Sequence, residues 1–206
     1  MASRLDSVKK NRRLVFCAFM TALIVVLQAL AYALAALGFK IAPSLVLVPV
    51  VIGGMILGVR YGAMLGFLFG IITFVGCVTG IDPGGAILFA ARPLLNFVLC
   101  VTKGTLAGLE AALLYHSISS HGTKRQRISS VFAAASCPVV NTGVFILFMV
   151  FGYMDTLKSW ASGTDVLTYI IIGLVGINFL IELLLNVIIV PLIYPTLSKS
   201  RFVKNI

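Results

Sequence analysis

The sequence predicts an all-α membrane protein, a single domain over residues 1–206 with six transmembrane helices, both termini in the cytoplasm and a capped external pocket. Hydrophobic residues make up 60% of the 206 positions and charged residues only 11%, whereas about a quarter of the residues in a soluble domain are charged. Several apolar stretches reach the ~20 residues that a helix needs to cross a bilayer, and none alternates like a membrane barrel. The solvent for most of this chain is therefore expected to be lipid.

Breaks between the spans are expected where glycine, proline and charged residues cluster, because backbone groups in lipid must be hydrogen-bonded within each helix. The first span is too long for the roughly 7–15 apolar residues of a signal peptide, the second is short, and the last is long enough to tilt. The expected spans are Leu14–Leu37, Ser44–Val59, Tyr61–Thr79, Phe97–Tyr115, Ser129–Tyr153 and Val166–Tyr194.

Glycines fall at every fourth position from Gly54 to Gly70. An unbroken helix from Ser44 to Thr79 would be near 50 Å at ~1.5 Å per residue, well beyond the membrane. The chain is therefore expected to turn between Gly58 and Gly62. The glycine stripe then allows close helix packing, which by itself indicates no chemistry.

The distribution of positive charge predicts the orientation. Most lysines and arginines fall in loops on one side of this layout, and only Lys40, Arg92 and Lys158 fall on the other. Because short cytoplasmic loops carry an excess of cations, both termini are expected in the cytoplasm. The net charge of +10 is thereby explained by membrane topology. Membrane lipid is an expected partner, and nucleic acid is not.

Polar side chains inside spans are the first candidates for function, because a central charge costs roughly 2.5–3.5 kcal/mol on insertion scales. Asn178, Glu182 and Asn186 form a stripe with i, i+4, i+8 spacing on the last span. Glu182 either contacts a ligand or joins an interhelical hydrogen bond. Lys103 in the fourth span either extends outward to the interface or meets an anionic ligand.

The fifth span contains the segment CPVVNTGVF, in which Pro138 frees a backbone carbonyl and Asn141 and Thr142 supply donors and acceptors. A helix broken here would line a cavity, and the alternative is a kink sealed by Thr142 or water.

Two outer segments are expected to close over a pocket. One is the partly apolar stretch from Thr79 to Asn96, and the other is the loop that contains Trp160. Trp160 contacts the ligand in this interpretation, and the alternative is an anchor at the membrane interface.

Enzyme activity is not expected, because the chain contains no phosphate loop, zinc-binding HExxH, serine elbow or Asp-rich metal motif. The four cysteines lack paired spacing, so neither a metal site nor a cofactor is expected.

Three segments carry a resemblance to a known family: LVPVVIGGMILGVRYGAMLGFLFG (Leu47–Gly70), VVNTGVF and INFLIELLLNVIIVP. With six expected spans, the chain resembles a substrate-binding S component of an energy-coupling factor (ECF) vitamin transporter. In such families the first span presents an Ala-x-x-x-Ala face to the transmembrane coupling subunit. The segment CAFMTAL here supplies Ala18 and Ala22.

The resemblance implies a vitamin-binding subunit of a prokaryotic cell membrane that docks on a coupling subunit driven by two ATPase subunits and delivers its substrate by tilting. Lys103, with Arg92 nearby in sequence, suits a ligand carboxylate. The groups suited to hydroxyls or amides are Asn96, Asn141, Asn178 and Glu182. Pantothenate is the expected substrate that ranks first for these side chains, followed by riboflavin and then folate. A lipid-modifying membrane enzyme and a packing scaffold are the alternative functions.

Overall fold

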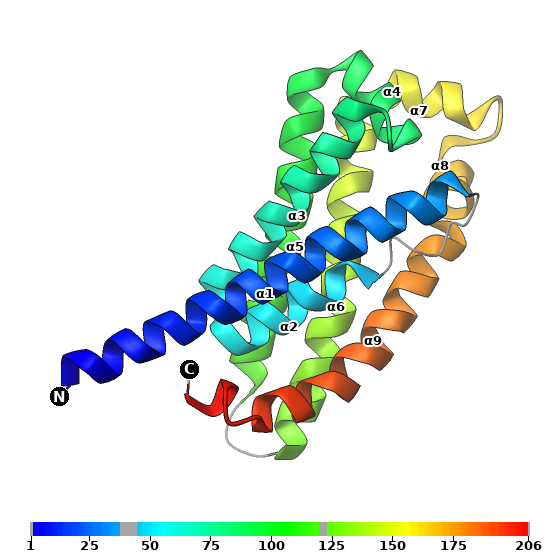
Figure 1. Ribbon diagram of the computed structural model, residues 1–206. Helices are drawn as coiled ribbons and strands as arrows, with labels where there is room; N and C mark the ends of the chain where they lie inside the picture. The colour runs from blue at the N-terminus through cyan, green and yellow to red at the C-terminus, as the bar shows by residue number, and fades with distance from the viewer. Residues whose placement is uncertain (1, 38–44, 120–122, 206) are drawn as a thin grey trace.

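The computed structural model describes residues 2–37, 45–119 and 123–205, and these are almost entirely helical (Figure 1). The elements, in order, are α1 (Ala2–Ala36), α2 (Leu47–Leu57), α3 (Val59–Thr79), α4 (Pro83–Ala91), α5 (Pro93–Ile118), α6 (Thr123–Gly152), α7 (Met154–Ala161), α8 (Val166–Tyr169), a π-helix (Ile170–Val175), α9 (Gly176–Lys199) and a 3-10 turn (Val203–Asn205).

Five of these helices, α1, α3, α5, α6 and α9, are long and apolar enough to cross a membrane. Helix α2 has only 11 residues, about 16 Å at ~1.5 Å per residue, against a hydrocarbon core of ~30 Å. The second of the six expected spans is therefore not shown to cross. Its expected start, Ser44, lies outside the described residues.

The expected turn in the glycine stripe is confirmed at Gly58, which separates α2 from α3 with a φ of 105°. Only glycine adopts this conformation readily. Farther along, the stripe lets the backbones of α3 and α5 touch, because a Cβ atom on Gly66 would lie 2.1 Å from the carbonyl oxygen of Gly104.

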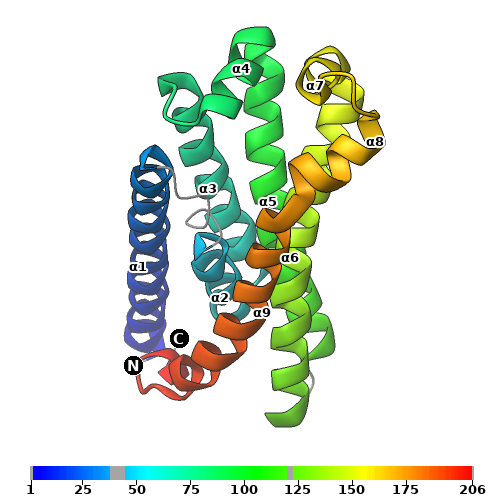
Figure 2. The same ribbon diagram turned by 90° about the vertical axis from the view of Figure 1, so that its right-hand side faces the viewer.

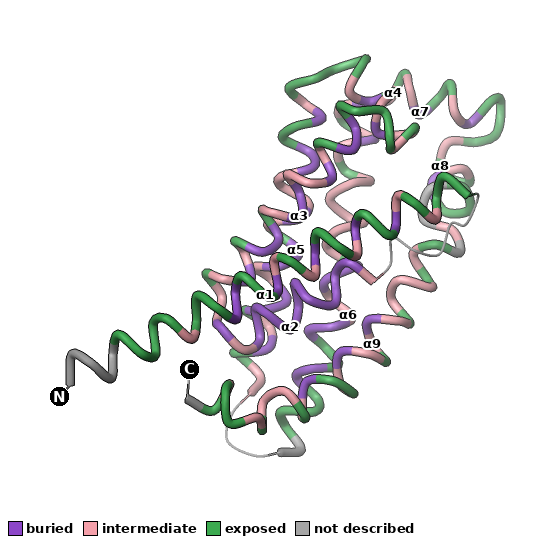
Figure 3. The backbone as a smooth tube through the Cα atoms, in the orientation of Figure 1, coloured by how far each residue is buried: buried purple, intermediate pink, exposed green. Residues whose placement is uncertain are grey.

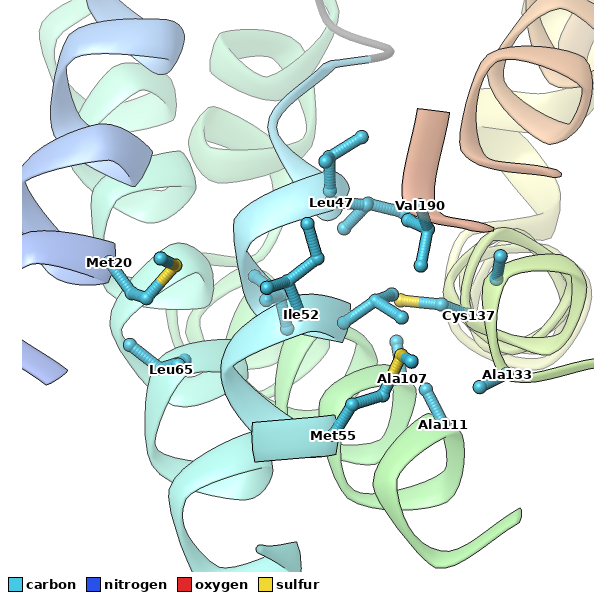
Figure 4. Close-up of a cluster of buried hydrophobic side chains, with 14 of the residues drawn as sticks. Met20, Leu47, Ile52, Met55, Leu65, Ala107, Ala111, Ala133, Cys137 and Val190 are labelled. Atoms are coloured by element: carbon cyan, nitrogen blue, oxygen red, sulfur yellow. The ribbon is translucent and has the colours of Figure 1, made fainter. Parts of the chain in front are cut away.

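Helix α2 lies at the centre of the main hydrophobic core, and nearly all of its residues are buried (Figure 3). Figure 4 shows side chains from five other helices, α1, α3, α5, α6 and α9, gathered around it. The core thus surrounds a helix too short to span, and much of the outward surface of the long helices is apolar and exposed, as lipid contact requires (Figure 3).

Both chain ends lie toward the same end of the bundle, while α4 and α7 lie at the opposite end (Figures 1 and 2). The guanidinium of Arg12 stacks 6.0 Å above the ring centre of Phe202 and joins the two terminal segments. The two terminal segments therefore lie at the same end of the bundle, and their placement in the cytoplasm stays a prediction.

The last span differs from the continuous helix expected over Val166–Tyr194. It consists of α8, the π-helix and α9, and the break falls at Gly176, which has a φ of 34°. Of the two alternatives at Pro138, a broken helix and a sealed kink, the structure does not show the break, because α6 continues through this residue. A proline lacks one N–H donor but does not always end a helix.

The expected cap from Thr79 to Asn96 is itself helical. It contains α4 and the first turn of α5, which begins at Pro93 rather than at Phe97. Asn96 therefore lies on a long helix and not in a loop.

Candidate ligand-binding site

A cavity of about 390 Å³ lies among α3, α4, α5, α6, α7 and α9. Every residue predicted to contact a ligand lines it: Asn96, Lys103, Asn141, Thr142, Trp160, Asn178 and Glu182. These residues come from four different helices, α5, α6, α7 and α9. The fold thus brings together polar side chains that are up to 86 positions apart in the sequence, and their contact with a ligand stays a prediction.

The charges in this cavity are unevenly distributed. Lys103 is the one cation among its described lining residues, and Asp82 and Glu182 are the acids. The ammonium of Lys103 lies 5.6 Å from the ring centre of Phe145, a cation–π contact. Lys103 and Glu182 are close enough to interact electrostatically, yet no ion pair joins them within the described part of the chain.

Asn96 holds the start of α5 to α4. Its side chain is fully buried, and its Nδ2 donates to the carbonyl of Gly85 at 3.0 Å. Its Oδ1 accepts from the Cys100 thiol at 3.2 Å. Because both ends of this amide already have protein partners, the geometry favours a positioning role for Asn96.

Asp82 fixes the start of α4, and so the position of the Gly85 carbonyl that Asn96 contacts. Its carboxylate accepts from the backbone N–H of Gly85 at 3.1 Å, and Pro83 follows it at the first helical position. These are the usual N-terminal signals of a helix. Gly85 must stay small, because a Cβ there would lie 2.3 Å from the Cys77 sulfur.

Asn141 carries a buried side-chain oxygen on the cavity wall. Its Oδ1 atom is buried and has no hydrogen bond to any described residue. Most buried polar side-chain atoms are paired, so an unpaired acceptor facing a cavity indicates a bound donor or an ordered water.

The polar stripe on α9 is divided between two environments. Asn178 and Glu182 line the cavity, whereas Asn186 is fully buried outside it and donates from Nδ2 to the Glu182 carbonyl at 2.9 Å. Arg92 is exposed and also lies outside the cavity, and its carbonyl accepts from the Tyr153 hydroxyl at 3.0 Å.

No metal site is visible, because the described residues contain no group of three or more His, Cys, Asp or Glu side chains that could hold an ion. Cys77 and Cys100 both line the cavity as free thiols, with their sulfurs 4.0 Å apart.

Comparison with known proteins identifies the family. The family described as "ECF transporter, substrate-specific component" matches residues 12–194. The chain belongs to this family. A curated protein of Lactococcus lactis subsp. cremoris (strain MG1363), the pantothenic acid transporter PanT, is 27% identical over 172 residues, which cover 79% of this chain and 81% of the relative. No solved structure matches.

Membership confirms the resemblance drawn from the sequence. This substrate-specific component is a multi-pass membrane protein of a transporter, and neither the family nor the relative is described as an enzyme. ECF components of this kind bind a vitamin and work with an energy-coupling module. On its α1 helix, Ala18 and Ala22 are both exposed.

Sequence reasoning missed several lining residues of this substrate-specific component. The Asp-Pro-Gly-Gly run is a helix-start signal that could have placed Asp82 at the beginning of a helix, and Phe145 lies one turn after Asn141 on the same face of α6. Phe179 follows Asn178 directly, so spacing alone did not place it at the cavity.

Proposed function

We propose that this substrate-specific component binds pantothenate. The observation that carries the proposal is the position of Lys103, the one cation of the described lining, in a cavity whose other polar groups are amides, hydroxyls, thiols, an indole N–H and acids. The relative described as a pantothenic acid transporter supports the same ligand. Pantothenate carries one carboxylate, one amide and two hydroxyls, and the ammonium, amides, hydroxyls and carboxylates of this lining can bond to these groups.

The binding mode follows from the chemistry of the walls. The Lys103 ammonium binds the carboxylate, because it is the cation of the described lining and Phe145 holds it in place without neutralising it. Asn141, Asn178 and Glu182 bind the amide and hydroxyls. The volume of about 390 Å³ falls within the usual range for small-molecule sites, roughly 300–1,000 Å³.

Aromatic and apolar side chains complete the pocket. Trp160 and Phe179 contribute faces that pack against the branched carbon skeleton of the ligand. Both α4 and α7 lie at the end of the bundle away from the chain termini (Figure 2). In this proposal they form the cap of a pocket that opens to the outside of a prokaryotic cell membrane, with both termini and their cations in the cytoplasm.

Docking on the energy-coupling module is proposed to use α1. Ala18 and Ala22 are exposed on the side of α1 that does not pack on the bundle. A surface of small side chains allows another helix to approach closely. The proposed partner is a transmembrane coupling subunit with two ATPase subunits, against which the loaded protein tilts to release the vitamin.

The test is direct binding. The purified chain is examined by native mass spectrometry for a retained small molecule and then titrated calorimetrically with pantothenate, riboflavin and folate. We expect pantothenate to bind most tightly and the other two to bind weakly. The aromatic walls favour riboflavin as the second candidate, and preferential riboflavin binding would replace the pantothenate assignment. Failure to bind any of the three would overturn the proposal.

A further inference from the structure

A second cavity, of about 240 Å³, lies beside the first and reaches beneath α1. Helix α1 contributes Gln28, Ala31, Tyr32 and Ala35 to its wall. We call this space the α1 chamber. It shares five lining residues with the first cavity: Thr73, Asp82, Lys103, Asn141 and Glu182. The two spaces therefore adjoin along the polar wall that the proposed ligand occupies.

Two buried polar atoms on the wall of the α1 chamber have no hydrogen-bond partner among the described residues, the Tyr32 hydroxyl and Asn141 Oδ1. The Tyr32 hydroxyl lies beside Gln28 but makes no hydrogen bond of normal geometry with it. Leaving a buried polar atom unpaired costs about 1–3 kcal/mol. Two such atoms from α1 and α6 on one chamber indicate a bound group that pairs with both.

The position of Tyr32 depends on a glycine. A Cβ atom built on Gly76 would lie 2.1 Å from the Tyr32 hydroxyl oxygen and 2.5 Å from the ring carbon that carries it. Any larger residue on this face of α3 would displace the ring. The bare backbone at Gly76 thus lets the hydroxyl occupy its place in the chamber wall.

The charges on the wall of the α1 chamber disfavour a second acidic group of the ligand there. Lys103 is again the one cation of the described lining, while Asp82 and Glu182 would repel an anion. A hydroxyl suits the unpaired atoms, because it both donates and accepts a hydrogen bond. It can therefore pair with the Asn141 amide in either orientation of that group, and with the Tyr32 hydroxyl as well.

We propose that the α1 chamber is a subsite for the uncharged, hydroxyl-bearing end of the ligand, with Tyr32 as a specificity-determining residue and Gln28 beside it. The ligand carboxylate stays at Lys103, where the two cavities adjoin. This inference rests on the proposed function. It adds α1 to the binding site, so that one helix contacts the ligand on one face and carries the exposed alanines on the other.

The test compares Tyr32→Phe with the wild-type chain in calorimetric titrations of pantothenate and of its two deoxy analogues, each of which lacks one hydroxyl. We expect the substitution to weaken pantothenate binding by about three- to tenfold, the worth of one neutral hydrogen bond. With the analogue that lacks the contacting hydroxyl, Tyr32→Phe should cause no further loss. Gly76→Ala, which displaces the Tyr32 ring, should show the same dependence on that hydroxyl.

Tyr61→Phe is the matched control, because Tyr61 also lies on a helix of the bundle and lines neither cavity. It should leave all three affinities unchanged. Equal affinities of wild type and Tyr32→Phe for pantothenate, or an equal loss for all three ligands, would overturn the subsite while the proposed function stands. A wild-type chain that does not bind pantothenate would overturn both.

Discussion

Replacing Lys103 by methionine should weaken the binding of an anionic ligand far more than that of its neutral amide. Methionine is also long and unbranched, so the change removes the charge and leaves most of the side-chain volume beside Phe145. A hydrogen bond to a charged group contributes about 1.5–3 kcal/mol. At ~1.4 kcal/mol per factor of ten, the pantothenate affinity should fall about 10- to 150-fold.

The assay is calorimetric titration with pantothenate and with pantothenamide, in which the carboxylate is replaced by a primary amide. The amide carries no charge, so its affinity should change by less than about threefold in Lys103→Met. Lys158→Met is the matched control, because Lys158 is exposed on α7 and lines neither cavity. An unchanged pantothenate affinity, or an equal loss for acid and amide, would refute the role of Lys103.

Three further predictions concern packing, positioning and docking. Gly66→Ala should destabilise the protein by about 1–3 kcal/mol in denaturant unfolding, because the new Cβ meets backbone at 2.1 Å. Gly143→Ala, with nothing within 4 Å, is its control and should be neutral or stabilising. Asn96→Leu should lower both stability and ligand affinity, since it releases α4 from α5. Ala18→Trp should preserve calorimetric ligand binding but reduce vitamin uptake by the complete transporter, because the bulk obstructs docking.

Each of these has a result that contradicts it. Equal stabilities of the two alanine variants would mean that α3 and α5 are not in backbone contact. Full stability of Asn96→Leu would mean that the hydrogen bond from Asn96 to Gly85 does not hold α4 to α5. For α1, the control is Leu30→Trp, on a lipid-exposed position of the same helix. A similar loss of uptake in both tryptophan variants, or a loss of binding in Ala18→Trp, would argue against a docking face.

The sequence predicted the site well where burying a polar side chain in lipid would cost much free energy. Polar residues are expensive inside a membrane, so Lys103, Asn141 and Glu182 were candidates from their positions alone, and all three line the cavity. The break at Gly58 followed from the length of the membrane, because a continuous helix would have been too long.

Local patterns were less reliable for breaks within an apolar run. The sequence left open whether Pro138 interrupts its helix, and α6 continues through it, whereas Gly176 interrupts the last span with a positive φ. Both residues occur in long apolar segments, and which of them breaks the helix depends on tertiary packing that spacing does not report. Asn186 shows the same limit, because it shares the stripe of Glu182 but is buried outside the cavity.

The most direct measurement is an experimental structure of the full chain with pantothenate bound. We expect the ligand between α5, α6 and α9, with its carboxylate within hydrogen-bond distance of Lys103 Nζ. One of its hydrogen-bond donors should bond to Asn141 Oδ1. Pantothenate found elsewhere on the protein, or side chains filling the space between Lys103 and Glu182, would contradict the account.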